Sequence, residues 1–281
     1  MEIRLGWSGG QGRRREPRRE GSAIVAQRLN GERFVLLGWT RAILLQLAHP
    51  LIAAGVYDHS SFRATPLAAA SRLHSTIRAM LALSFGTDAE REHALHGIRT
   101  IHTRVNGQLR ETVGVFPAGS SYSAEDPALV LWVHLTLLES IPLTYELFVG
   151  PVSDQDRDRY CAESAWVATA LGARPADVPV TWAHASDQLS RMYASGVLAV
   201  GSQAHELSVA VLAPRFSRLF PPLASWNRLV AVGLLPADIR RQYRLPWNDS
   251  DQRRFERSVA RLRRLRRSLP DVVALWPESR A

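Results

Sequence analysis

The sequence contains no lysine: all 35 basic residues are arginine, and against 26 acidic residues they give a formal net charge of +9. Complete replacement of lysine is typical of a high-GC coding bias rather than of selection for phosphate contacts. Much of the basic excess lies in residues 13–19 and 253–267 rather than across the body of the chain. The charge therefore does not indicate a nucleic-acid partner, and we expect none.

The sequence is equally poor in cysteine and in long apolar runs. Cys161 is the only cysteine, which excludes an intrachain disulfide and a cysteine metal cluster. No run of about 18 uninterrupted apolar residues occurs, so we expect no transmembrane span. The arginines near the start are not followed by an apolar segment, so no secretory signal is recognised and a cytoplasmic location is expected.

The remaining composition is that of an ordinary globular protein, with 46% hydrophobic and 22% charged residues in 281. Residues 1–22 hold little that can be buried and are predicted to be a disordered basic tail. From there on, apolar residues recur at helical spacing, without β-alternation, a glycine-rich phosphate loop or internal repeats. We therefore predict that residues 23–281 form a single large all-α domain of many helices.

One predicted helix carries a histidine in its apolar stripe. A helix that directs an imidazole into a core of leucine, isoleucine and valine needs a partner for the ring. Either neighbouring groups satisfy the ring nitrogens, or His102 is an axial ligand to haem iron. The stripe lies within residues 95–109 and consists of Leu95, Ile98, Ile101, His102, Val105 and Leu109.

Two further histidines lie in apolar helical segments. His49 precedes Pro50 within residues 39–56, where proline predicts a kink and His49 either satisfies a freed group, contacts a cofactor or packs. His134 lies in a helix that begins at Asp126-Pro127. His102 and His134 are interpreted as a bis-imidazole pair, as one ligand with one distal group, or as two unrelated core residues.

Three other polar residues are candidates for a site. Arg72 and Thr76 are one turn apart on a helix predicted from Pro66 to about Phe85. An inward guanidinium would need an anion such as a haem propionate, bound dioxygen or a carboxylate, and the alternative is a surface arginine beside a threonine bonded to its own helix. Asp58 lies in a polar segment, residues 57–63, that we predict to be a loop.

Taken in order, these segments resemble the MpaB-type oxygenases, whose catalytic domain is shared with the latex clearing (rubber oxygenase) protein. The resemblance covers about residues 30–250. It is carried by R-A-I-L-L-Q-L-A-H-P-L-I-A-A-G-V (41–56), D-H-S-S-F-R (58–63), R-L-H-S-T (72–76), I-R-T-I-H-T-R-V-N-G (98–107), Y-S-A-E-D-P-A-L-V-L-W-V-H-L-T-L (122–137) and Y-E-L-F-V-G-P-V-S (145–153).

The resemblance implies an all-helical fold with haem b buried between helices and histidine on the iron. The family's ligand motif is similar to the segment around His102, with His134 as the substitute. Arg72 and Thr76 resemble the distal Arg/Thr pair, and Asp58 is the nearest match to a catalytic acid. Ser75 stands where the latex clearing protein has a lysine, so a lysine-capped iron is not expected.

The resulting hypothesis is a cytoplasmic haem b oxygenase that uses dioxygen or peroxide on a hydrophobic alkene, isoprenoid or aromatic substrate. Arg99 and Arg104, which flank His102, are candidates for pairing with the haem propionates. Three alternatives remain: a haem carrier or sensor without turnover, a cofactor-free helical binding protein, and nucleic-acid binding through the arginine-rich ends.

Overall fold

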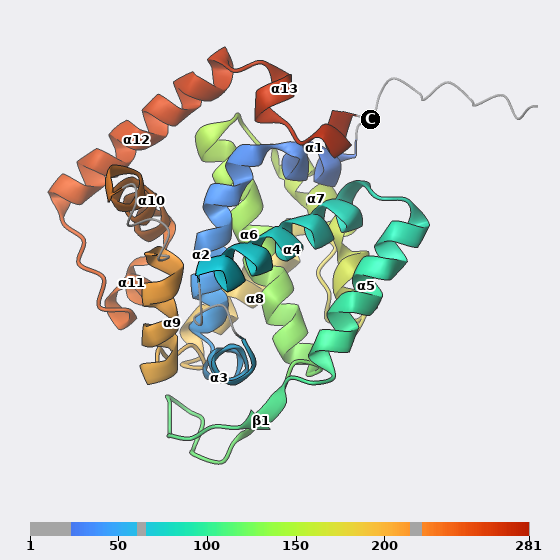
Figure 1. Cartoon of the computed structure of the whole chain (residues 1–281), viewed down its shortest axis with the longest axis vertical. Helices are drawn as coiled ribbons and strands as arrows, with labels where there is room; N and C mark the ends of the chain where they lie inside the picture. Colours follow the sequence, from blue (N-terminus) through green and yellow to red (C-terminus); the bar gives the residue numbers. More distant parts are fainter. Residues whose placement is uncertain (1–23, 61–65, 214–220, 281) are drawn as a thin grey trace, which may run out of the picture.

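The structure, a computed structural model, describes residues 24–60, 66–213 and 221–280, so the predicted tail of residues 1–22 lies outside it. The described part is mostly helical, which confirms the main fold prediction (Figure 1). The principal helices are α1 (Val25–Gly31), α2 (Leu36–Leu47), α3 (Pro50–His59), α4 (Pro66–Phe85), α5 (Asp88–His102), α6 (Pro127–Phe148), α7 (Asp154–Ala170), α8 (Trp182–Ala194), α9 (Ser202–Leu212), α10 (Pro221–Leu234), α11 (Ala237–Gln242), α12 (Asp249–Ser268) and α13 (Asp271–Ala274).

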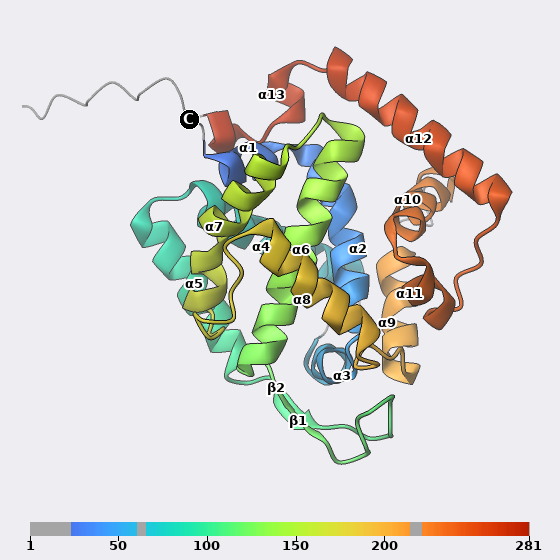
Figure 2. The ribbon, with the colours of Figure 1, turned by 180° about the vertical axis from the view of Figure 1, so that it is seen from behind.

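A short antiparallel hairpin departs from the predicted all-α fold. Strands β1 (Asn106–Gln108) and β2 (Ser121–Ser123) pair, with Gly107 opposite Tyr122. Three-residue strands are too short to show the alternation by which a strand is recognised in a sequence. The sequence analysis places residues 106–108 in the helical stripe of residues 95–109, which is wrong: they form strand β1 of a hairpin between α5 and α6 (Figure 2).

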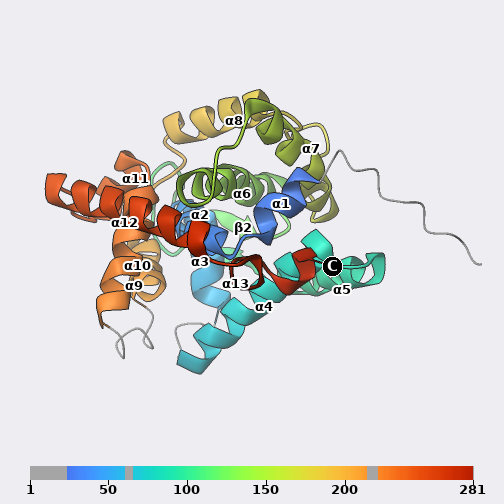
Figure 3. The same ribbon diagram turned by 90° about the horizontal axis from the view of Figure 1, so that it is seen from above.

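The long helix α6 is the centre of the domain. It lies between α7 and α8 on one side and α2 and α4 on the other (Figure 3). Asp126 caps it by accepting a hydrogen bond from the N–H of Ala128 at 2.8 Å, and Pro127 occupies the first turn, as predicted. By length and composition α6 passes as a membrane-crossing helix, and 61% of its most apolar window is buried inside the protein. A core helix has the same properties.

The predicted single kinked helix over residues 39–56 is wrong in form, because two helices occupy this stretch. The segment Arg33–Leu47, which includes α2, and the helix α3 are bent by 105° relative to each other. His49 is the N-cap residue of α3 and Pro50 its first residue, where the missing N–H of proline costs no hydrogen bond. The sharp turn carries Asp58 into the last turn of α3 rather than into a loop.

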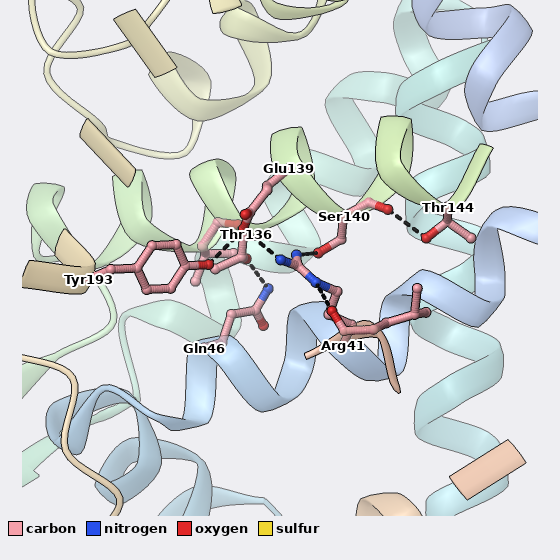
Figure 4. Close-up of polar contacts among 9 residues, drawn as sticks. Arg41, Gln46, Thr136, Glu139, Ser140, Thr144 and Tyr193 are labelled. Carbon is pink, nitrogen blue, oxygen red and sulfur yellow. Dashed lines mark hydrogen bonds and ion pairs between the residues drawn. The ribbon is translucent and has the colours of Figure 1, made fainter. Parts of the chain in front are cut away.

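A buried polar cluster fastens α2 to α6 (Figure 4). Arg41, which is 2% exposed, pairs with Glu139 at 3.0 Å and donates to the hydroxyl of Ser140 at 2.7 Å and to the carbonyl of Leu234 at 2.8 Å. Tyr193 of α8 donates to the same Glu139 carboxylate at 2.7 Å. Every component of the cluster is therefore engaged, which is the condition under which buried charge is tolerated.

We predict that Arg41→Met destabilises the fold by about 3 kcal/mol, because Glu139 and Ser140 are left without their partner in a poorly hydrated site. Chemical denaturation measures the loss. Arg191→Met is the matched control, since the Arg191–Asp187 pair is mostly exposed and worth less than about 1 kcal/mol. Equal losses in the two variants would contradict the anchoring role of Arg41.

Candidate functional site

Two cavities meet at the centre of the domain. The α3-side cavity has a volume of about 400 Å³ and is lined by α2, α3, α4, α5, α6, α7 and the hairpin. The α1-side cavity, of about 490 Å³, is lined by α1, α2, α4, α5, α6 and α7. Both volumes lie within the range of small-molecule sites, roughly 300–1,000 Å³. Their shared wall consists of Gln46, Thr76, His102, Val133, His134, Leu137, Val167 and Leu171.

His102 reaches the shared wall from the last turn of α5. The predicted apolar stripe over residues 95–109 is wrong beyond this point, because α5 ends at His102. Val105 and Leu109 belong to the hairpin region, and Ile101 is 59% exposed. The helix begins at Asp88, and Thr87 is the N-cap residue of a capping box with Glu90.

The His102 ring has an unpaired nitrogen. Its Nδ1 is buried and has no hydrogen-bond partner among the described residues. Burial lowers the pKa of His102, against an opposing effect of the Glu125 charge. The imidazole is therefore held in its neutral form, which is the form that binds metals.

His134 occupies the opposite part of the same wall, in the middle of α6. Its Nε2 is also buried without a hydrogen-bond partner in the described part of the chain, and the residue is only 7% exposed. Burial lowers the pKa of His134 to about 4. Buried nitrogens without partners are uncommon in folded proteins, and two of them on one cavity wall mark it as a candidate binding site.

Asp58 lies next to the α3-side cavity and is connected to it through Tyr122. The Tyr122 hydroxyl donates to Asp58 at 2.8 Å, and Arg110 pairs with the same carboxylate at 2.6 Å. Tyr122 and His59 line the cavity, and the His59 Nε2 lies 3.0 Å from the carbonyl of Asn106. Burial and the Asp58 carboxylate raise the pKa of Tyr122 to about 12, so the phenol keeps its proton.

Of three other predicted site residues, one lines the cavities, one does not, and one has a side chain outside the described structure. Thr76 lies on the shared wall, whereas the Arg72 side chain, one turn earlier on α4, is outside the described part of the structure. His49 lines neither cavity; its ring packs against Phe116 at a centroid distance of 5.3 Å. Burial lowers its pKa to about 4, against an opposing effect of Asp126.

The two arginines that flank His102 point away from the cavities. Arg99 donates from Nε to the carbonyl of Ala170 at 2.9 Å, where it satisfies an end carbonyl of α7. Arg104 is exposed in the turn after α5. Neither residue lines a cavity wall.

Tyr122 carries no role in the sequence analysis, because its partner Asp58 is 64 residues away and no local pattern links them. Gly107, opposite Tyr122 in the hairpin, makes the contact possible: a Cβ at this position would lie 2.5 Å from the Tyr122 hydroxyl.

Comparisons with known proteins give a family and two distant relatives. An uncharacterized protein of Mycobacterium tuberculosis and one of Mycobacterium bovis are each 25% identical over 244 residues, which is 81% of this chain and 87% of theirs. No solved structure gives a significant match. Residues 27–264 match the family described as "ER-bound oxygenase mpaB/B'/Rubber oxygenase, catalytic domain". The resemblance found in the sequence is thus confirmed, and the chain belongs to this family of oxygenase-type catalytic domains.

Proposed function

We propose that this protein is a haem b-dependent oxygenase that acts on a hydrophobic small molecule with dioxygen or peroxide as the oxidant. The observation that carries the proposal is the pair of unpaired imidazole nitrogens, His102 Nδ1 and His134 Nε2, on the shared wall of the two cavities. The family supplies the reaction class. Cytoplasmic location is part of the proposal.

The donor set fits haem better than a metal ion held by side chains alone. Among the described residues no group of three or more His, Cys, Asp or Glu is placed to hold a metal ion. A non-haem iron site needs such a group, typically two histidines and a carboxylate. Haem brings four nitrogen ligands of its own and would need only one or two more from the protein, which His102 and His134 could provide.

Haem, when bound, supplies the redox chemistry of the reaction. The neutral imidazole of His102 or His134 would hold the haem. The apolar side chains of Val133, Leu137 and Val167 on the shared wall would exclude water. Thr76 offers a hydroxyl on the same wall. Tyr122, which lines the α3-side cavity, donates its proton to Asp58, and Arg110 pairs with that carboxylate and holds it in place.

The second candidate is a haem-binding carrier or sensor that does not oxygenate a substrate. It is favoured by the same pair of histidines, because a haem held by both imidazoles would have no free coordination position for the oxidant. The absorption spectrum separates the two: a protein with one axial imidazole gives a high-spin ferric spectrum, and one with two gives a low-spin spectrum.

We predict that the purified protein shows a Soret band and that His102→Ala abolishes the ferric spectrum. Absorption spectroscopy with a haem titration measures this. His93→Ala, at an exposed position on the same helix, is the control and keeps the band. Retention of the wild-type spectrum in His102→Ala with its loss in His134→Ala would transfer the ligand role to His134. The absence of a Soret band, even with added haem, would contradict the proposal that the protein binds haem.

We predict that Asp58→Asn and Tyr122→Phe each lower turnover of an apolar alkene about 100-fold while haem content stays unchanged. The double variant is no worse than either single variant, because the two side chains act as one unit. Glu92→Gln, exposed on α5, leaves turnover unchanged. Additive losses in the double variant would show that Asp58 and Tyr122 act separately.

Buried neutral histidines also predict a pH dependence of stability. Between pH 6.5 and about 4, His134 and His49 are protonated in the unfolded chain but stay neutral in the folded protein. Their contribution to the free energy of unfolding is therefore fully present above pH 6.5 and is lost as the pH falls toward 4. Each ring contributes about 3 kcal/mol over this window. Chemical denaturation of the haem-free protein at pH 7 and pH 4.5 measures the slope. His134→Leu should reduce it by about half, and an unchanged slope would contradict neutral burial of His134.

A further inference from the structure

The α1-side cavity differs in chemistry between its two ends. At the α2 and α6 end the walls are apolar around the two histidines, with Ala42, Ile43, Leu138 and Ile141. At the other end α1, α4, α5 and α7 converge (Figure 3). This end presents a set of polar side chains: Gln27, Asn30, Ser84, Arg91, Glu163 and Ser164.

Most of the polar groups at this end are already satisfied by one another. Gln27 donates to the Ser84 carbonyl and Asn30 to the Ser84 hydroxyl, each at 3.2 Å. The Glu163 carboxylate accepts from the N–H of Ala26 at 2.7 Å and lies 3.5 Å from Arg159. These contacts leave Glu163 engaged on both oxygens, so it does not serve as the partner of Arg91.

Two donors in this cavity lack a partner. The Nε of Arg91 and the Nε1 of Trp39 are buried, and neither makes a hydrogen bond to a described residue. Arg91 contacts Asp88 through Nη1 at 3.3 Å, at a fully exposed carboxylate, and its guanidinium lies over the Trp166 ring. Guanidinium and indole nitrogens donate only, so the missing group must be an acceptor. The positive charge on Arg91 favours an anionic acceptor.

The polar end of the cavity lies far from His102 along α5. Arg91 and His102 are eleven residues apart on one helix, which places them about 16 Å apart along its axis. This separation suits an elongated ligand. An apolar chain with an acidic end can place its acid at Arg91 while its chain extends toward His102 and His134.

We propose that the polar end of the α1-side cavity is a carboxylate subsite, and that the substrate is an elongated apolar molecule with a terminal carboxylic acid. Arg91 Nε donates to the carboxylate, and Trp39 Nε1 is the second donor without a partner in the described lining of this cavity. The apolar walls on α2 and α6 enclose the chain. This inference names the substrate class of the proposed oxygenase and rests on that proposal for the reaction, but the binding it requires does not depend on haem.

The test compares lauric acid with methyl laurate and dodecanol, which keep the chain and remove the charge. Isothermal titration calorimetry measures binding to the protein as purified and to three variants. We expect the acid to bind about 10- to 100-fold more tightly than the ester. In Arg91→Met, which keeps the apolar stem, the affinity for the acid falls to that for the ester, while the affinity for the ester is unchanged.

Trp39→Phe, which removes one donor and keeps an aromatic ring, produces a smaller loss of affinity for the acid. Arg78→Met is the matched control, since Arg78 is exposed on α4 and lines neither cavity, and it binds the acid as the wild type does. Equal affinity of the wild type for acid and ester, or an unchanged affinity for the acid in Arg91→Met, would overturn the subsite. If Arg91→Met does not fold, the acid-to-ester ratio of the wild type and the Trp39→Phe result decide.

The two proposals fail separately. A missing Soret band with a retained preference for the acid would remove the haem oxygenase and leave a binding site for apolar acids. A Soret band with no such preference would keep the oxygenase and remove the carboxylate subsite.

Discussion

The ion pair between Arg41 and Glu139 fixes the position of α2 on α6, and the site depends on that position. Arg41 is engaged on all three guanidinium nitrogens, by Leu234, Ser140 and Glu139. A buried ion pair of this kind adds little net stability. It disfavours other registers of α2 on α6, because sliding one helix along the other would leave a buried charge without its partner. One turn away, Gln46 of α2 donates to Thr136 of α6 at 2.9 Å and lines both cavities beside His134. The same contact surface thus sets the helix register and the cavity wall.

The cavity wall combines two features that folded proteins usually avoid. The first is empty volume next to a well-packed core, whose central residues, such as Trp132 and Leu138, are fully buried. The second is a set of buried nitrogens without partners, on His102, His134, Trp39 and Arg91. Each unpaired group carries a desolvation cost that a bound ligand would remove. The histidines lie on the shared wall, and Trp39 and Arg91 line the α1-side cavity alone. The two proposed ligands, a haem at the histidines and an acidic chain at Arg91, would account for both features.

Helix starts and the family were predictable from the sequence, whereas the contacts that build the site were not. Local capping chemistry placed the beginnings of α4 at Pro66 and α6 at Pro127. The helical stripe through His102 failed because hydrophobic spacing reports burial, not conformation: Leu109 is buried, but in a small cluster beside the hairpin. Arg41 carries no role in the sequence analysis, because its partner Glu139 is 98 positions away in the sequence. Pairings of that separation are decided by tertiary packing.

The central claim is that His102 and His134 face a haem. Crystals of the haem-reconstituted protein, measured at the iron absorption edge, test it most directly, because anomalous scattering locates iron independently of phases from the protein fold. The account predicts an iron peak at the shared wall of the two cavities, within coordination distance of His102 Nδ1 or His134 Nε2. An iron position away from both nitrogens, or cavities without iron in protein that has been saturated with haem, would contradict it.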